Sequence, residues 1–144
     1  MTARPSEKRM RVAFDVDDTI TRCPEFFALL SRALRAGRSQ VYIITFREDR
    51  EGTEQELREW GIEYDELVMA TDGELDACGF YRWKADACRR RKIDIFFEDM
   101  PEVINLLDES TIAMMPIDPP LGKVAYEATT EEPGRIEEEP SRRR

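Results

Sequence analysis

Four acidic side chains stand where they could bind a metal ion together. Asp15 and Asp17 end one short apolar run, and Glu98 and Asp99 end a later one. Residues two apart in an extended chain point to the same side, so the carboxylates of Asp15 and Asp17 lie close unless the chain turns between them. Such repulsion calls for a cation. Because these acids offer oxygen ligands and have no His or Cys beside them, the suited ion is Mg²⁺.

Three further polar residues accompany the acids. Thr45 and Arg47 leave another apolar run, and Lys84 lies in a basic segment. Arg47 could contact phosphate or substrate, although an arginine in a charged loop is more often solvated. Each feature also has a structural interpretation. The first acids could form a solvated turn, the Glu98-Asp99 pair could start a helix, and Lys84 could sit on an exposed basic face.

The composition excludes several kinds of chemistry. The 144 residues contain no histidine, which removes Ser-His-Asp and Cys-His catalysis and the His-based metalloenzymes. Cys23, Cys78 and Cys88 are odd in number and lack Cys-x-x-Cys spacing, so we expect reduced thiols and a cytoplasmic location. The formal charge of -9 argues against blanketing nucleic-acid phosphates or an anionic membrane. No apolar run is long enough for a membrane span.

Short β-rich runs alternate with segments of helical period, which predicts a parallel α/β sheet. The predicted strands are Met10–Val16, Gln40–Thr45, Leu67–Ala70, Ile93–Phe97 and Thr111–Met115. The predicted helices are Pro24 to Gly37, Glu51–Trp60, Trp83–Lys92 and Pro101–Leu107. These elements predict a three-layer, doubly wound α/β sandwich around a mostly parallel five-stranded sheet. Ligands of such sheets bind beyond the carboxyl ends of the strands, which is where the acids fall.

The first predicted helix carries an apolar stripe that we expect to face the core. The stripe consists of Phe26, Leu29, Leu30, Ala33 and Leu34, which share one side at helical spacing. A helix with this face is suited to cross from the first strand to the second.

Four motifs in order resemble those of the haloacid dehalogenase-like phosphatases. The first is Asp15-Val16-Asp17-Asp18-Thr19, which fits Asp-x-Asp-x-Thr. Thr45, Lys84 and the pair Glu98-Asp99 follow in the expected order. The resemblance covers about residues 10 to 115. Each motif alone is weak evidence for the family. All four in this order, at predicted strand ends or in the expected helix, are specific evidence for it.

The resemblance implies a Mg²⁺-dependent phosphohydrolase that cleaves a phosphate monoester through an aspartyl-phosphate. Asp15 would be the nucleophile. Asp17 would be general acid and then base, and its backbone carbonyl would bind the metal. The substrate would be a nucleotide, a sugar phosphate or another small phosphorylated metabolite. Alternatives are a polynucleotide or protein phosphatase and a non-catalytic Mg²⁺ or phosphoryl-binding interaction module.

The remaining motif residues would bind phosphate and metal. The resemblance assigns Thr45 and Lys84 to the phosphate, with Arg47 as a further candidate. Asp99 would ligate Mg²⁺ directly, and Glu98 would be either a ligand or a support for the ligands. Together with Asp15 and Asp17, these acids form the expected metal site.

The chain departs from the family pattern in two respects. Asp18 stands where glycine is usual. The gaps between motifs, residues 20 to 44 and 46 to 83, leave no room for a full cap domain. We therefore expect a capless hydrolase domain over residues 10–118, an N-terminal extension over 1–9 and a flexible charged tail over 119–144. An open site favours either a homo-oligomer that covers it or a bulky substrate. Nucleic acid is possible but not favoured by the charge.

Overall fold

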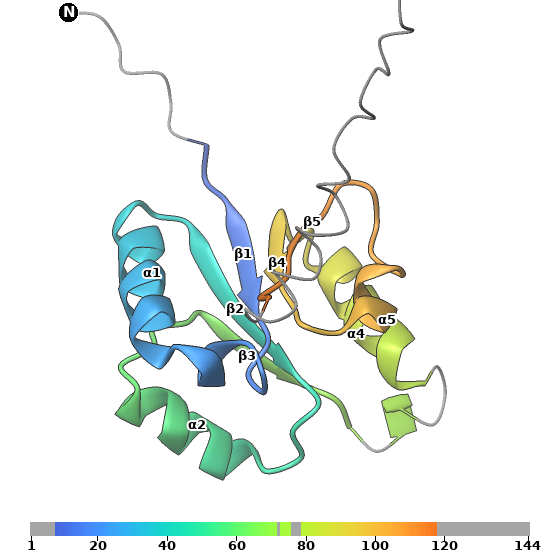
Figure 1. The fold of residues 1–144 in the computed structure, drawn as a ribbon, viewed down its shortest axis with the longest axis horizontal. Helices are drawn as coiled ribbons and strands as arrows, with labels where there is room; N and C mark the ends of the chain where they lie inside the picture. The colour runs from blue at the N-terminus through green and yellow to red at the C-terminus, as the bar shows by residue number, and fades with distance from the viewer. Residues whose placement is uncertain (1–7, 72, 76–78, 118–144) are drawn as a thin grey trace, which may run out of the picture.

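The computed structural model describes residues 8–71, 73–75 and 79–117. Its centre is a sheet of five strands in the order β3-β2-β1-β4-β5 (Figure 1). The strands are β1 (Arg11–Phe14), β2 (Gln40–Thr45), β3 (Glu66–Met69), β4 (Ile95–Phe97) and β5 (Ile112–Met114). Every neighbouring pair is parallel. The α/β prediction is confirmed, and the sheet is parallel throughout.

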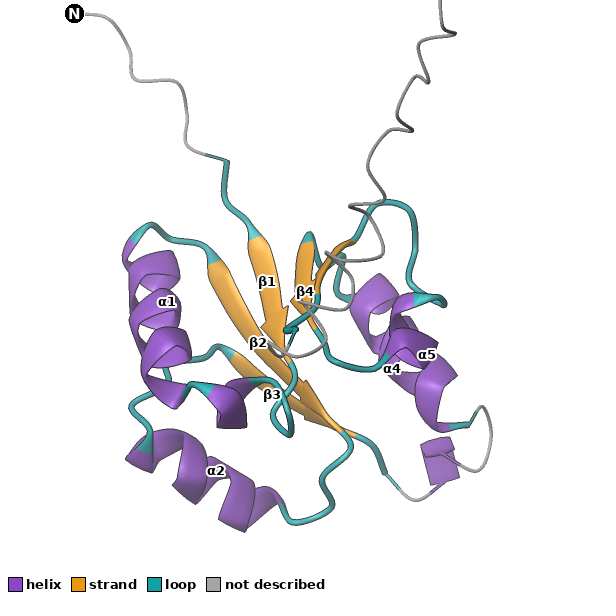
Figure 2. Cartoon of the chain, viewed as in Figure 1, coloured by secondary structure: helices purple, strands orange, loops and turns teal. Residues whose placement is uncertain are grey.

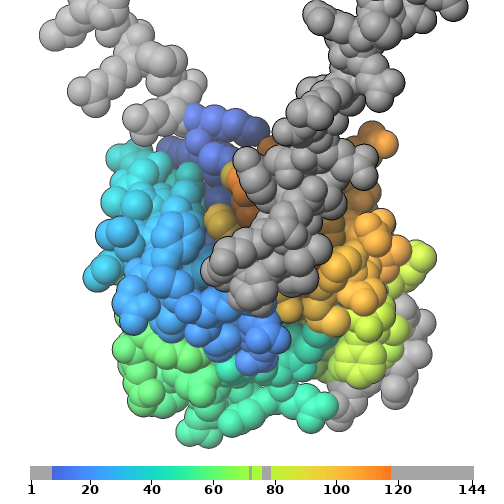
Figure 3. All heavy atoms as spheres, viewed as in Figure 1, coloured from blue at the N-terminus to red at the C-terminus, as the bar shows by residue number. Residues whose placement is uncertain are grey.

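Helices cover both faces of this sheet. One face carries α1 (Pro24–Ala36) and α2 (Arg50–Glu59), and the other carries α4 (Phe80–Arg90) and α5 (Pro101–Ile104) (Figure 2). A single 3-10 turn, η1 (Ile20–Arg22), precedes α1. In the space-filling view, η1, α1 and α2 form one continuous surface (Figure 3). No helix among the described residues is long and apolar enough to span a membrane.

The alternating side chains of the inner strands divide the core between the two faces. Val12 and Phe14 of β1 pack on the α1 and α2 side, whereas Ala13 packs toward α4. In β2, Val41 and Ile43 likewise face α1 and α2. Strands that are buried on both faces read as continuous apolar runs, which is why the sequence identified them readily.

Several predicted boundaries shift. Strand β1 ends at Phe14 rather than Val16, and a turn over residues 16–19 follows. Helix α4 begins at Phe80 instead of Trp83. Helix α5 ends at Ile104, three residues short of its predicted end. These differences leave the connections between elements unchanged.

The predicted core stripe of α1 is wrong in part. Phe26 is 48% exposed and Leu29 is 63% exposed. The helix instead buries Phe27, Ala28 and Ser31. Phe27 decides this rotation, because its ring enters a buried aromatic cluster on the sheet. The Ser31 hydroxyl is satisfied there, donating to the Ala28 carbonyl and accepting from the Glu63 amide.

The cysteines and the tail are only partly described. Cys23 is an exposed free thiol and Cys88 a buried one. Burial raises the pKa of the Cys88 thiol, which keeps it protonated and unreactive at neutral pH. Cys78 and the predicted tail lie outside the described residues.

Candidate functional site

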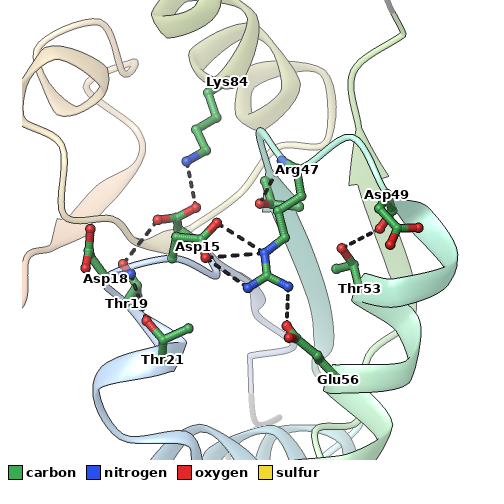
Figure 4. Close-up of polar contacts among 11 residues, drawn as sticks. Asp15, Asp18, Thr19, Thr21, Arg47, Asp49, Thr53, Glu56 and Lys84 are labelled. Atoms are coloured by element: carbon green, nitrogen blue, oxygen red, sulfur yellow. Dashed lines mark hydrogen bonds and ion pairs between the residues drawn. The ribbon is translucent and has the colours of Figure 1, made fainter.

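A buried lysine lies between two buried acids at the carboxyl edge of the sheet. Lys84, on α4, is 1% exposed, and its Nζ donates to Asp15 Oδ1 over 2.7 Å. The same Nζ lies 2.8 Å from Oε2 of Glu98, which is fully buried after β4. Figure 4 shows Lys84 extending from its helix toward Asp15. The sequence placed these three residues in one site, and the structure brings them together.

Both oxygens of Glu98 have polar neighbours. Its Oε1 accepts the Met100 amide over 3.2 Å. Its Oε2 forms a buried ion pair with Lys84, whose Nζ lies 2.8 Å away and also contacts Asp15. Glu98 and Asp15 therefore share one ammonium.

Asp99 completes a cluster of three carboxylates. One oxygen from each of Asp15, Glu98 and Asp99 lies within 4.8 Å of the other two. Asp99 is partly exposed, so the cluster opens to solvent on its side. The donor set contains only oxygen, which suits a hard cation such as Mg²⁺.

The electrostatics of the cluster favour a proton or a cation over free negative charge. Burial raises the pKa of Asp15 to about 8 in spite of the Lys84 ammonium, and Glu98 adds to the rise. Burial also raises the pKa of Glu98, again against the effect of Lys84. One ammonium therefore does not compensate the buried carboxylates.

The side chain of Asp17 pairs with Arg47 and is not part of the cluster of Asp15, Glu98 and Asp99. It is 60% exposed, and Arg47 Nη2 lies 2.9 Å from its Oδ1. A turn follows directly after β1, and Asp18 takes a left-handed φ of 59° within it. Aspartate tolerates that conformation better than most residues. Asp17 therefore lies with Arg47 at the rim of the site.

Arg47 bridges two acids at the rim of the site. It contacts Asp17 through Nε and Nη2, and it forms an ion pair with Glu56 of α2 through Nη1 (Figure 4). The hydrogen bonds to Asp17 raise the pKa of Arg47, so it stays charged. Arg47 is thus held at the site rather than solvated. Sequence reasoning missed Glu56, because nothing distinguishes it among the acids of a polar helix.

Two threonines line the same edge. Thr45 ends β2 with 1% exposure, and its Oγ1 accepts the Arg47 amide over 3.3 Å. Thr19, equally buried, donates to Asp15 Oδ2 over 3.4 Å. Both hydroxyls therefore fix neighbouring groups of the site.

Comparison with known proteins gives limited information. No protein-family model and no curated protein matches the chain. An uncharacterized protein from Corynebacterium glutamicum resembles it in structure with a TM-score of 0.49 and 12% identity, over 85% of this chain and 93% of that one. A universal stress protein in complex with cAMP gives 0.44 and 11%, over 75% and 96%. A universal stress protein from Archaeoglobus fulgidus gives 0.44 and 15%, over 72% and 92%.

These findings correct the functional prediction. The similar structures are universal stress proteins and an uncharacterized protein, not phosphatases, which contradicts a Mg²⁺-dependent phosphohydrolase acting through an aspartyl-phosphate. At these TM-scores and identities they assign no function in its place. The family resemblance, the domain bounds, the cytoplasmic location and the homo-oligomer stay predictions.

Proposed function

We propose that the carboxyl edge of the sheet binds one Mg²⁺ ion between Asp15, Glu98 and Asp99, and that this ion holds a small phosphorylated ligand. The observation that carries the proposal is the convergence of three carboxylates, two of them buried, on one lysine: one oxygen from each of Asp15, Glu98 and Asp99 lies within 4.8 Å of the other two, and Asp15 and Glu98 share the Lys84 ammonium. An ion placed among the three carboxylates would supply the positive charge that one ammonium does not.

The charge balance supports a divalent ion. Three ionised carboxylates and the Lys84 ammonium leave two negative charges in the cluster. Burial is the main cause of the raised pKa values of Asp15 and Glu98, and for Asp15 the neighbouring Glu98 adds to the rise. A Mg²⁺ ion neutralises both charges and accepts carboxylate oxygens as ligands.

The groups around the cluster support an anionic ligand. Mg²⁺ usually keeps several ligand positions for water or phosphate oxygens. Asp99 is partly exposed, so solvent reaches the cluster on its side. Arg47 lies at the rim of the site, where it forms ion pairs with Asp17 and Glu56. A phosphoryl group on the ion would meet this guanidinium, which is well suited to phosphate oxygens.

Calorimetric titration tests the proposal in two stages. Mg²⁺ alone should bind with a stoichiometry of one, and inorganic phosphate should then bind only in its presence. Glu98→Gln removes the charge of a buried carboxylate of the cluster and should weaken Mg²⁺ binding at least about ten-fold. The control Glu54→Gln alters an exposed acid of α2 and should leave binding unchanged. Absence of a Mg²⁺ isotherm for the wild-type protein would overturn the proposal.

A further inference from the structure

Arg47 contacts its two acids in different ways. The carboxylate of Asp17 lies along one edge of the guanidinium, where both of its oxygens accept from Nε over 3.1–3.3 Å. Its Oδ1 also accepts from Nη2 over 2.9 Å. Glu56 pairs with Nη1 alone. Two neighbouring N–H groups of an arginine bind phosphate oxygens in the same manner as carboxylate oxygens. Asp17 therefore occupies a place that the oxygens of an anionic ligand could take.

Contacts of the preceding residue place Arg47 beside the acid cluster. Phe46 lies against the ammonium of Lys84, whose Nζ is 4.3 Å from the centre of the Phe46 ring. The same ammonium contacts Asp15 and Glu98. The acid that occupies the edge of the guanidinium follows Asp15 by two residues in the chain. An anion bound to a cation in the cluster would therefore arrive next to this guanidinium.

The rim of the site carries an excess of negative charge. Arg47 has one positive charge, and Asp17 and Glu56 together have two negative charges, so the three side chains are negative by one. Charges of like sign that are brought together weaken binding. The guanidinium attracts a phosphoryl group most strongly when one of its two acids gives way.

Asp17 is the acid that is better able to give way. Its side chain is 60% exposed, against 45% for Glu56. Among the described residues, its carboxylate has polar contacts with Arg47 only. The turn that carries it is held by a separate contact, because the Asp18 amide donates to the Thr21 hydroxyl over 2.9 Å. Rotation of the Asp17 side chain into solvent would therefore free the guanidinium while the backbone stays in place.

We propose that Asp17 competes with the ligand for Arg47: its carboxylate holds the guanidinium edge while the site is empty, and a phosphoryl group bound to the cation displaces it. This inference rests on the proposed function and adds how anion binding at that site is regulated. The carboxylate keeps Arg47 oriented at the rim, and every anion that enters must replace a partner already in place.

Calorimetric titration of inorganic phosphate in the presence of Mg²⁺ tests the inference. Asp17→Asn removes the competing charge and should tighten phosphate binding about five-fold relative to the wild type. Mg²⁺ alone should bind this variant with the wild-type affinity, because the Asp17 side chain is not part of the carboxylate cluster. An equal change in Mg²⁺ affinity would show that Asp17 acts on the cation, and the inference would be wrong.

Two comparisons separate competition for the guanidinium from a general effect of charge. Glu56→Gln removes a negative charge from the same guanidinium but leaves Asp17 in place, so phosphate binding should tighten less than about two-fold. In an Arg47→Met background, Asp17→Asn should lose its effect, because no guanidinium remains to compete for. Comparable tightening in Glu56→Gln, or an undiminished effect of Asp17→Asn without Arg47, would contradict the competition.

The same titrations distinguish this inference from the proposed function. If phosphate binds the wild type and Asp17→Asn equally well in the presence of Mg²⁺, the competition is wrong and the cation site stands. If phosphate binds neither protein, the proposed function itself is overturned. Tighter binding to Asp17→Asn that depends on both Mg²⁺ and Arg47 is the result we expect.

Discussion

The two ends of the sheet use the same residue types for different purposes. At the amino end, a hollow of about 570 Å³ is lined by Arg32, Arg35 and Arg38 together with Glu63 and Asp65. Arg35 pairs with both acids at 3.5–3.6 Å in solvent. Asp65 also accepts the Val41 amide at the start of β2 over 2.8 Å. Arg35, Glu63 and Asp65 there form exposed pairs, and Asp65 also holds the start of β2.

At the carboxyl end the charges are buried and unbalanced. Asp15 and Glu98 share the Lys84 ammonium, and Asp99 adds a third carboxylate to the same cluster. The comparison teaches that residue type and charge alone do not mark a site. Burial without full charge compensation does mark one, because buried carboxylates in excess of their counter-charges cost stability unless a cation or a proton binds them.

The largest difference between the two ends of the sheet should come from removing a positively charged side chain. Lys84→Met leaves two buried acids without a counter-charge and should lower the free energy of unfolding by about 3–5 kcal/mol. Arg35→Met breaks only exposed pairs and should cost less than about 1 kcal/mol. Urea unfolding of both variants at neutral pH measures the contrast. Equal losses would remove the distinction between the ends.

The pH dependence of stability should sharpen the comparison. Burial raises the pKa of Asp15 from 3.8 to about 8, so the folded state holds an extra proton between these values. The stabilising contribution is complete below the lower pKa and is lost as pH rises through the higher one. With EDTA present, Asp15 therefore adds a downward slope between about pH 4 and about pH 8. The wild-type slope should be more negative than that of Asp15→Asn, and identical slopes would contradict the shifted pKa.

Asp15→Asn should stabilise the cation-free protein. The amide leaves Lys84 and Glu98 as a one-to-one pair, and we expect a gain of about 1–2 kcal/mol near pH 8. Added Mg²⁺ should raise the melting temperature of the wild type but not of this variant. The control Asp65→Asn at the amino end should lose less than about 1 kcal/mol and keep the Mg²⁺ response. A destabilised Asp15→Asn would show that its charge is already compensated.

The smallest effect should come from the rim of the site. Glu56→Gln weakens an ion pair with Arg47 whose acid is 45% exposed, so the free energy of unfolding should change by less than about 1 kcal/mol. Thermal unfolding with and without salt measures it. If Glu56→Gln lowered the free energy of unfolding as much as Lys84→Met, the ion pairs of Arg47 would belong to the buried cluster and not to its exposed rim.

The sequence predicted the sheet well because buried parallel strands are continuous apolar runs with little competing interpretation. It also placed Asp15, Lys84, Glu98 and Asp99 at one edge, since strand ends and motif order are visible in one dimension.

Three features could not be predicted, because they depend on tertiary packing. The rotation of α1 follows from the fit of Phe27 against the sheet, which turns Phe26 and Leu29 outward. The pairing of Asp17 with Arg47 joins the turn after β1 to the segment after β2, which are 30 residues apart in the chain. The ion pair of Arg47 with Glu56 joins a loop to a helix face, and the spacing of residues in the sequence does not predict it.

Anomalous X-ray diffraction from crystals soaked in Mn²⁺ tests the central claim most directly, because Mn²⁺ prefers the same oxygen ligands as Mg²⁺. The account predicts one strong anomalous peak between the carboxylates of Asp15, Glu98 and Asp99, lost in Glu98→Gln crystals. Peaks confined to exposed acids such as Glu63 and Asp65, with the buried cluster empty, would contradict it.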